Sequence, residues 1–170
     1  MPRRYPRRYK GNRDKYSIEQ TSFLSSSVAN WHGVNAIPNE TQASLQWECL
    51  IVPPDSTQGM RKVKHLNITL CNAGNDAMPL WYALVYVPEG YLAQDLRLSL
   101  VGDATYLYPA NQFVMSAGVV DFSAGPTHIR CPLSRNLNGG DRIILIMATY
   151  TSAPTANQIA GEVTYAVTLQ

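Results

Sequence analysis

The chain has 170 residues, a formal net charge of +2 at pH 7, 45% hydrophobic residues and 15% charged residues. This length favours a single domain, and the hydrophobic content excludes a wholly disordered chain. The charged fraction is low for a soluble monomer, which predicts that much of the surface contacts other protein. Because Met1 is followed by prolines and arginines, we predict no secretory signal, and the longest apolar run, residues 80–87, is too short to span a bilayer.

The first segment along the chain is strongly basic. Residues 1–15, MPRRYPRRYKGNRDK, hold seven basic residues and one acidic residue and therefore carry a charge of +6. Subtracting them from the totals of 14 basic and 12 acidic residues leaves seven basic and eleven acidic residues, a net charge of −4, on residues 16–170. We expect a basic arm at 1–15 in front of a globular domain at 16–170, because the arm has too few apolar residues for a core. Such an arm favours binding to a polyanion, of which nucleic acid is the most abundant.

The candidate nucleic-acid-binding residues of the arm are its cations, which neutralise phosphates, and its tyrosines, which stack on unpaired bases. They are Arg3, Arg4, Tyr5, Arg7, Arg8, Tyr9, Lys10, Arg13 and Lys15. A second basic cluster, Arg61, Lys62 and Lys64, opens a later strand-like run. It either extends the basic track of the arm or protects a strand edge from unwanted pairing. A solvated tail or a nuclear-import signal is the alternative interpretation of the arm.

From residue 16 onward the chain reads as strands separated by turns. The run around 46–51 alternates apolar Trp47, Cys49 and Ile51 with polar neighbours, which is typical of a strand with one buried face. The other predicted strands are 16–25, 63–71, 80–87, 113–122, 128–133, 143–150 and 163–169, with 97–107 as a further candidate. Turn residues such as Pro88-Glu89-Gly90 separate the runs, and the best helical candidate is a short turn within 90–95.

Eight or nine short strands with little helical pattern predict an all-β sandwich or barrel. Two runs, 80–87 and 143–148, are apolar at successive positions, so both of their faces are predicted to be dry. A strand with two dry faces belongs at a central position, with its outer face covered by a loop or by a neighbouring subunit.

The sequence shows no arrangement of residues typical of catalysis or metal binding. His32, His65 and His128 have no partner at ligand spacing, there is no Cys-x-x-Cys, and there is no Gly-x-Ser-x-Gly nucleophile elbow. We therefore expect no enzymatic activity, no metal and no cofactor. Three cysteines in strand-like runs are predicted to be buried, reduced thiols: Cys49, Cys71 and Cys131.

Four stretches, in order along most of the chain, carry a resemblance to a known family. They are residues 58–64 (QGMRKVK), 81–90 (WYALVYVPEG), 108–114 (YPANQFV) and 134–141 (SRNLNGGD). Together with the arginine-rich arm, they resemble the capsid proteins of small circular single-stranded DNA viruses that encode their own replication initiator, the circovirus- and nanovirus-like group. The resemblance implies an eight-stranded antiparallel jelly-roll sandwich and about sixty copies in a T=1 icosahedral shell.

The resemblance also implies partners and a location. The arm would point into the particle and contact a circular single-stranded DNA genome, and the protein would pass through the host nucleus before it forms virions. Host nuclear import factors and an unknown receptor would be further partners, with no membrane association.

Two other functions share some of these features. A capsid protein of a small RNA virus or satellite virus would have the same arm and fold, since an Arg–Tyr arm binds either kind of single strand. A cellular nucleic-acid-binding barrel of the OB type would instead place its aromatic residues on a strand face, whereas here the stacking candidates lie in the arm and the remaining residues are acidic overall.

Overall fold

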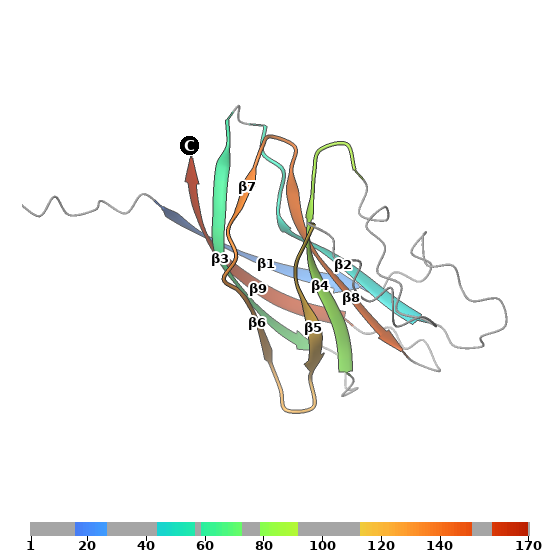
Figure 1. Ribbon diagram of the computed structural model, residues 1–170. Helices are drawn as coiled ribbons and strands as arrows, with labels where there is room; N and C mark the ends of the chain where they lie inside the picture. Colours follow the sequence, from blue (N-terminus) through green and yellow to red (C-terminus); the bar gives the residue numbers. More distant parts are fainter. Residues whose placement is uncertain are drawn as a thin grey trace, which may run out of the picture.

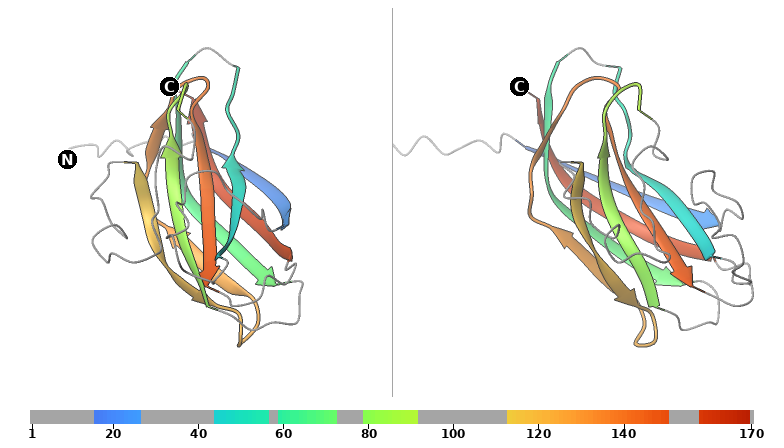
Figure 2. Two further views of the ribbon diagram at one scale, coloured as in Figure 1. Left: turned by 90° about the vertical axis from the view of Figure 1, so that its right-hand side faces the viewer. Right: turned by 45° about the vertical axis from the view of Figure 1, so that its right-hand side comes forward.

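The computed structural model describes residues 16–26, 44–56, 59–72, 79–91, 113–150 and 158–169, which form two antiparallel sheets packed face to face (Figures 1 and 2). The strands of this part of the chain are β1 (Ser17–Ser26), β2 (Ser44–Val52), β3 (Arg61–Asn72), β4 (Pro79–Val87), β5 (Val114–Asp121), β6 (Thr127–Cys131), β7 (Arg135–Leu137), β8 (Arg142–Tyr150) and β9 (Gln158–Leu169). The first sheet has the order β1-β9-β3-β6, with β7 also paired to β3, and the second has the order β2-β8-β4-β5.

The pairing of the strands is nested, as in a long hairpin rolled into two layers. β1 pairs with β9, β2 with β8, β3 with β6 and β7, and β4 with β5, all antiparallel. Rolling the hairpin adds the pairs β3–β9 and β4–β8, which complete the two sheets. This is the topology of a jelly roll, so the predicted all-β, jelly-roll fold is confirmed.

The seventh strand position differs from the prediction, because two short strands share it. β6 pairs with Leu66–Leu70 of β3, and β7 pairs with Arg61–Val63 of the same strand. Pro132, which has no N–H to donate, lies in the gap, and the predicted run 128–133 accordingly ends at Cys131. The eight expected strand positions are therefore occupied by nine strands in the described part of the chain.

The core fills the space between the sheets. Its largest fully buried side chains come from both layers, and each contributes about 1.5–3 kcal/mol by leaving water. They include Ile51, Leu66, Ile68, Leu70, Leu84, Ile129, Leu137, Ile143 and Leu145. In β9, buried Val163 and Tyr165 alternate with exposed Glu162, so the predicted period of two is confirmed there.

The two predicted strands with dry faces, β4 and β8, are the two central strands of their sheet, as expected. Their outer faces form a second buried cluster, to which Phe113 and Ala117 add partly buried contacts. The cluster consists of Ala83, Val85, Val87, Ile144 and Ile146. Because these side chains are buried within a single chain, no neighbouring subunit is needed to cover them.

Some sequence expectations lie outside the described residues, namely the arm at 1–15, the candidate strand at 97–107, and residues 92–95 of the possible helical turn. All three cysteines are free thiols, and Cys49 and Cys131 are buried as predicted. Cys71 is exposed instead, because it lies on the outer face of β3. Within the described ranges, no helix has the length and apolar character needed to cross a membrane.

Candidate nucleic-acid interface

The predicted binding residues fall into two groups. Those of the arm lie outside the described residues: Arg3, Arg4, Tyr5, Arg7, Arg8, Tyr9, Lys10, Arg13 and Lys15. The second cluster, Arg61, Lys62 and Lys64, lies on β3 and is described in full. The three side chains of this cluster do not share one environment.

Arg61 is buried, with 8% of its surface exposed. Its Nη2 donates hydrogen bonds to the backbone carbonyl oxygens of Pro53 and, at 3.3 Å, Asp141. Its Nε is buried without a hydrogen-bond partner. Arg61 therefore ties the segment before β3 to the segment before β8, and it does not extend a basic track on the surface, as one interpretation of the sequence had it.

Lys62 and Lys64 point away from the core because β3 contains a bulge. By spacing alone, both lysines share a face with Leu66, which is buried. The pairing of β3 with β9 shifts register between Lys64 and Asn67, and His65 in this bulge has a φ of 56°. The extra residue reverses the alternation, so that the lysines reach the outer face while Leu66 enters the core.

Lys64 also links the domain to the start of the arm. Its Nζ lies 3.5 Å from the ring centroid of Tyr16, a cation–π contact. Tyr16 is the residue directly after the predicted arm, and β1 is an edge strand of its sheet. Since one face of the Tyr16 ring is covered by Lys64, this ring differs from the freely stacking tyrosines expected of the arm.

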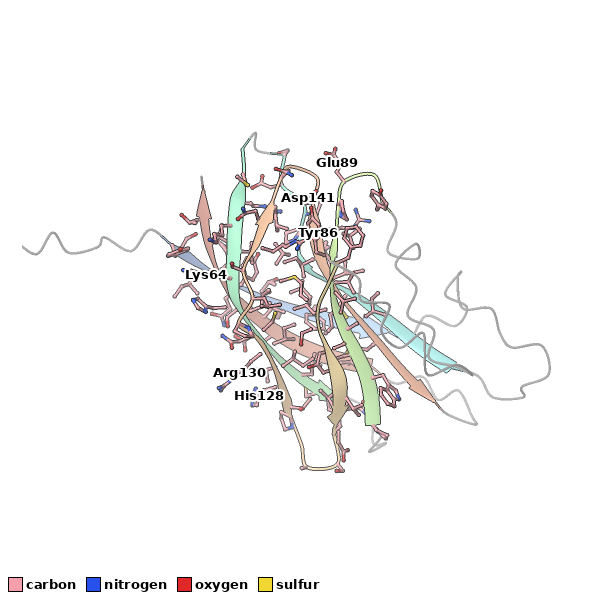
Figure 3. All side chains as sticks on the ribbon, viewed as in Figure 1. Lys64, Tyr86, Glu89, His128, Arg130 and Asp141 are labelled. Atoms are coloured by element: carbon pink, nitrogen blue, oxygen red, sulfur yellow. The ribbon has the colours of Figure 1, made fainter. Side chains whose placement is uncertain are left out.

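Two further nitrogen-bearing side chains lie on the same face, on β6. Arg130 is paired with Asn67, and His128 is paired with Thr69. The His128 Nδ1 and the Thr69 Oγ1 are 3.0 Å apart, and Figure 3 places Lys64, His128 and Arg130 on the same side of the molecule. Sequence reasoning missed Arg130, although its position between buried Ile129 and Cys131 marks it as outward-facing.

We call the outer surface of the first sheet the polar face. It is defined by Lys62, Lys64, Asn67, Thr69, His128 and Arg130. It also includes Glu162, whose Oε1 accepts a hydrogen bond from the Gln20 amide of β1. The polar face thus offers cations and hydrogen-bonding groups of the kind that contact phosphates and bases.

At one end of the sandwich, buried groups join the two sheets. Asp141, 3% exposed, accepts hydrogen bonds from the Tyr86 hydroxyl at 2.8 Å, the Asn138 N–H at 2.8 Å and the Glu89 N–H at 3.0 Å. Figure 3 shows Tyr86, Glu89 and Asp141 gathered at this end. Burial first, and then the Asp141 carboxylate, raise the pKa of Tyr86 to about 12.

The guanidinium of Arg135 covers the Tyr86 ring from the other sheet. Its central carbon lies 4.2 Å from the ring centroid, and Arg135 belongs to β7 whereas Tyr86 belongs to β4. Within the described ranges, no group of three or more His, Cys, Asp or Glu residues is placed to hold a metal ion.

Comparison with known proteins adds little to this description. No protein-family model matches the chain, and no curated protein matches its sequence. Among solved structures, a chain of Desmodium yellow mottle tymovirus aligns with all of this chain and with 96% of its own length, at 12% sequence identity and a TM-score of 0.26. A TM-score this low gives no support to any conclusion about function.

Proposed function

We propose that this chain is a viral capsid protein that self-assembles into a closed T=1 icosahedral shell of about sixty subunits and encloses single-stranded nucleic acid. The observation that carries the proposal is the combination of a jelly roll, a fold used by viral capsid domains, with an arm of charge +6 in front of it. In the proposed shell all arms point inward and neutralise the packaged strand.

The proposed genome is circular single-stranded DNA, on the strength of the resemblance in residues 58–64, 81–90, 108–114 and 134–141. Sixty arms of +6 supply roughly 360 positive charges, so lysines of the polar face would add to the neutralisation of a longer strand. The protein is proposed to act in the virion and in the host nucleus, with nuclear import factors and a receptor as partners, and to have no enzymatic activity.

Exposed apolar side chains are suited to contacts between subunits. Trp81 and Val119 lie directly opposite each other on β4 and β5, and they are 41% and 49% exposed. Large apolar side chains that adjoin on a surface favour protein–protein contact.

The assembly of purified full-length protein tests the proposal. We expect uniform shells of about sixty copies in sedimentation and negative-stain microscopy, in line with closed symmetry. We expect the protected nucleic acid to be degraded by DNase and not by RNase once the shells are opened. A sedimentation profile with only the 18.8 kDa monomer across pH and salt would overturn the capsid proposal, and RNase-sensitive contents would overturn the DNA genome.

The role of the arm is tested in the same preparations by a variant in which its seven basic residues are replaced by glutamine. Seven phosphate contacts predict that log affinity for a single strand falls with log salt with a slope of about −5. The glutamine variant should lose most of this salt dependence. Because the variant keeps the full length of the arm, it tests the charge alone, which a deletion would not. If the slope persists, the arm is not the genome-binding element, whether or not shells form.

A further inference from the structure

A polar pocket opens where the β7 edge of the first sheet meets β4 of the second. Its volume is about 380 Å³, and it is lined by Lys62, Tyr86, Ser134, Arg135 and Asn136. Lys62 and Asn136 are directly paired across β3 and β7, so the pocket is built on hydrogen-bonded strands on one side. The start of β7 adds Arg135 and the preceding Ser134 to the lining, and β4 of the other sheet adds Tyr86.

The lining is rich in hydrogen-bond donors and positive charge. Lys62 and Arg135 bring two cations, Asn136 brings an amide and Ser134 a hydroxyl, and no carboxylate is among the lining residues. Neither the Lys62 ammonium nor the Arg135 guanidinium has a hydrogen bond or an ion pair with any residue in the described part of the chain. Two cations at one concave site, with no counter-ion among the described residues, favour the binding of an anion.

The Tyr86 ring orients Arg135 for such a ligand. The central carbon of the guanidinium lies 4.2 Å from the ring centroid, and contact with an aromatic face leaves the N–H groups of an arginine available to a ligand. A guanidinium fork held in this way suits the paired oxygens of a phosphate, and less of its side-chain freedom is lost on binding. The Tyr86 hydroxyl is itself engaged with Asp141, and its raised pKa of about 12 keeps it uncharged at neutral pH.

We propose that this pocket binds one phosphate group of the backbone of the enclosed single strand, with Arg135 as a two-pronged donor and Lys62 as the neighbouring point charge. The inference rests on the proposed function, since it names a contact of the packaged strand. Lys62 belongs to the polar face, and Lys64 lies two residues further along β3, about 7 Å away at the usual rise per residue. A strand that runs along β3 from the start of the arm therefore passes Lys64 and reaches the pocket.

Binding of a fluorescent single-stranded oligonucleotide to the full-length protein tests the pocket. We expect Lys62→Gln and Arg135→Gln each to weaken binding about tenfold or more and to flatten the salt slope by about 0.7, the value for one phosphate contact. Arg135→Lys should keep the slope but lose affinity, since it keeps the charge and lacks the fork. Arg142→Gln is the matched control, because it removes an equal charge from β8, outside both the pocket and the polar face.

The source of the phosphate is tested with inorganic phosphate, titrated by calorimetry against wild type and Lys62→Gln. If the variants weaken binding of inorganic phosphate but leave oligonucleotide affinity unchanged, the pocket takes a free anion and the proposal is wrong. Equal effects of Lys62→Gln and Arg142→Gln, in protein that still forms shells, also overturn it. Failure of wild-type protein to form shells would count against the proposed function and not against the pocket. If Arg135→Gln does not fold, Lys62→Gln still tests the pocket.

Discussion

The outer faces of the two sheets differ in almost every respect. That of the first sheet, the polar face, is exposed and carries lysine, arginine, histidine and amide side chains on β3 and β6. The outer face of β4 and β8 in the second sheet is apolar, with Ala83, Val85, Val87, Ile144 and Ile146 buried and Trp81 exposed at its end. One sandwich thus contains a sheet with one face exposed to water and a sheet whose central strands have buried side chains on both faces.

The difference separates a sheet with polar side chains on its outer face from a sheet whose central strands are covered on both faces. The central strands β4 and β8 of the second sheet have buried apolar side chains on both faces. The first sheet packs against the core through one face, and the polar side chains of its other face are exposed or partly exposed. Tyr16, the first described residue after the arm, contacts that face through Lys64.

The largest effect is expected from a polar side chain in the dry outer face of the second sheet. Ile144→Asn buries an amide with no arranged partner and should lower the free energy of unfolding by about 3 kcal/mol or more. The matched change Thr164→Asn on the outer face of β9 should cost less than about 1 kcal/mol. Urea unfolding followed by tryptophan fluorescence measures both, and equal losses would contradict the distinction between the two faces.

An intermediate effect is expected at the end where the two sheets are joined through Tyr86. Its pKa of about 12 lies above the ordinary 10.0, so the fold favours the protonated phenol. That contribution is complete below pH 10 and is lost as the pH rises from 10 to about 12. We expect the free energy of unfolding to fall in this window, and to fall less in Tyr86→Phe.

Some of the alkaline loss should remain in Tyr86→Phe, since burial also raises the pKa of Tyr165. Denaturant unfolding at a series of pH values measures the difference between wild type and variant. An identical alkaline loss in both proteins would show that the Tyr86 hydroxyl does not contribute to the pH dependence of stability.

The smallest effect is expected on the polar face itself. Lys64→Gln removes the cation–π contact with Tyr16 and should cost about 0.5–1 kcal/mol, because the pair is close to solvent. Lys62→Gln, two residues away with no ring contact in the described residues, should stay within about 0.5 kcal/mol of wild type. A double-mutant cycle with Tyr16→Leu isolates the pair, and a coupling of zero would remove the link between arm and polar face.

Much of the fold was predictable because it depends on local pattern. The alternation at Val163 and Tyr165 predicted a strand with one buried face, and the apolar runs at 80–87 and 143–148 predicted the central strands β4 and β8. Such patterns directly indicate which faces of a strand are buried. The separation of charge between residues 1–15 and the domain is likewise a property of the sequence alone.

The composition of the candidate interface was decided by tertiary structure. The bulge at His65 turned Lys62 and Lys64 outward, and the contacts of Arg61 with Pro53 and Asp141 took that side chain into the interior. The pocket needs Arg135 of one sheet to rest on Tyr86 of the other, residues 49 positions apart in the sequence. Bulges, register and contacts between sheets depend on which distant segments pair. The sequence pattern of one strand does not identify the strand with which it pairs.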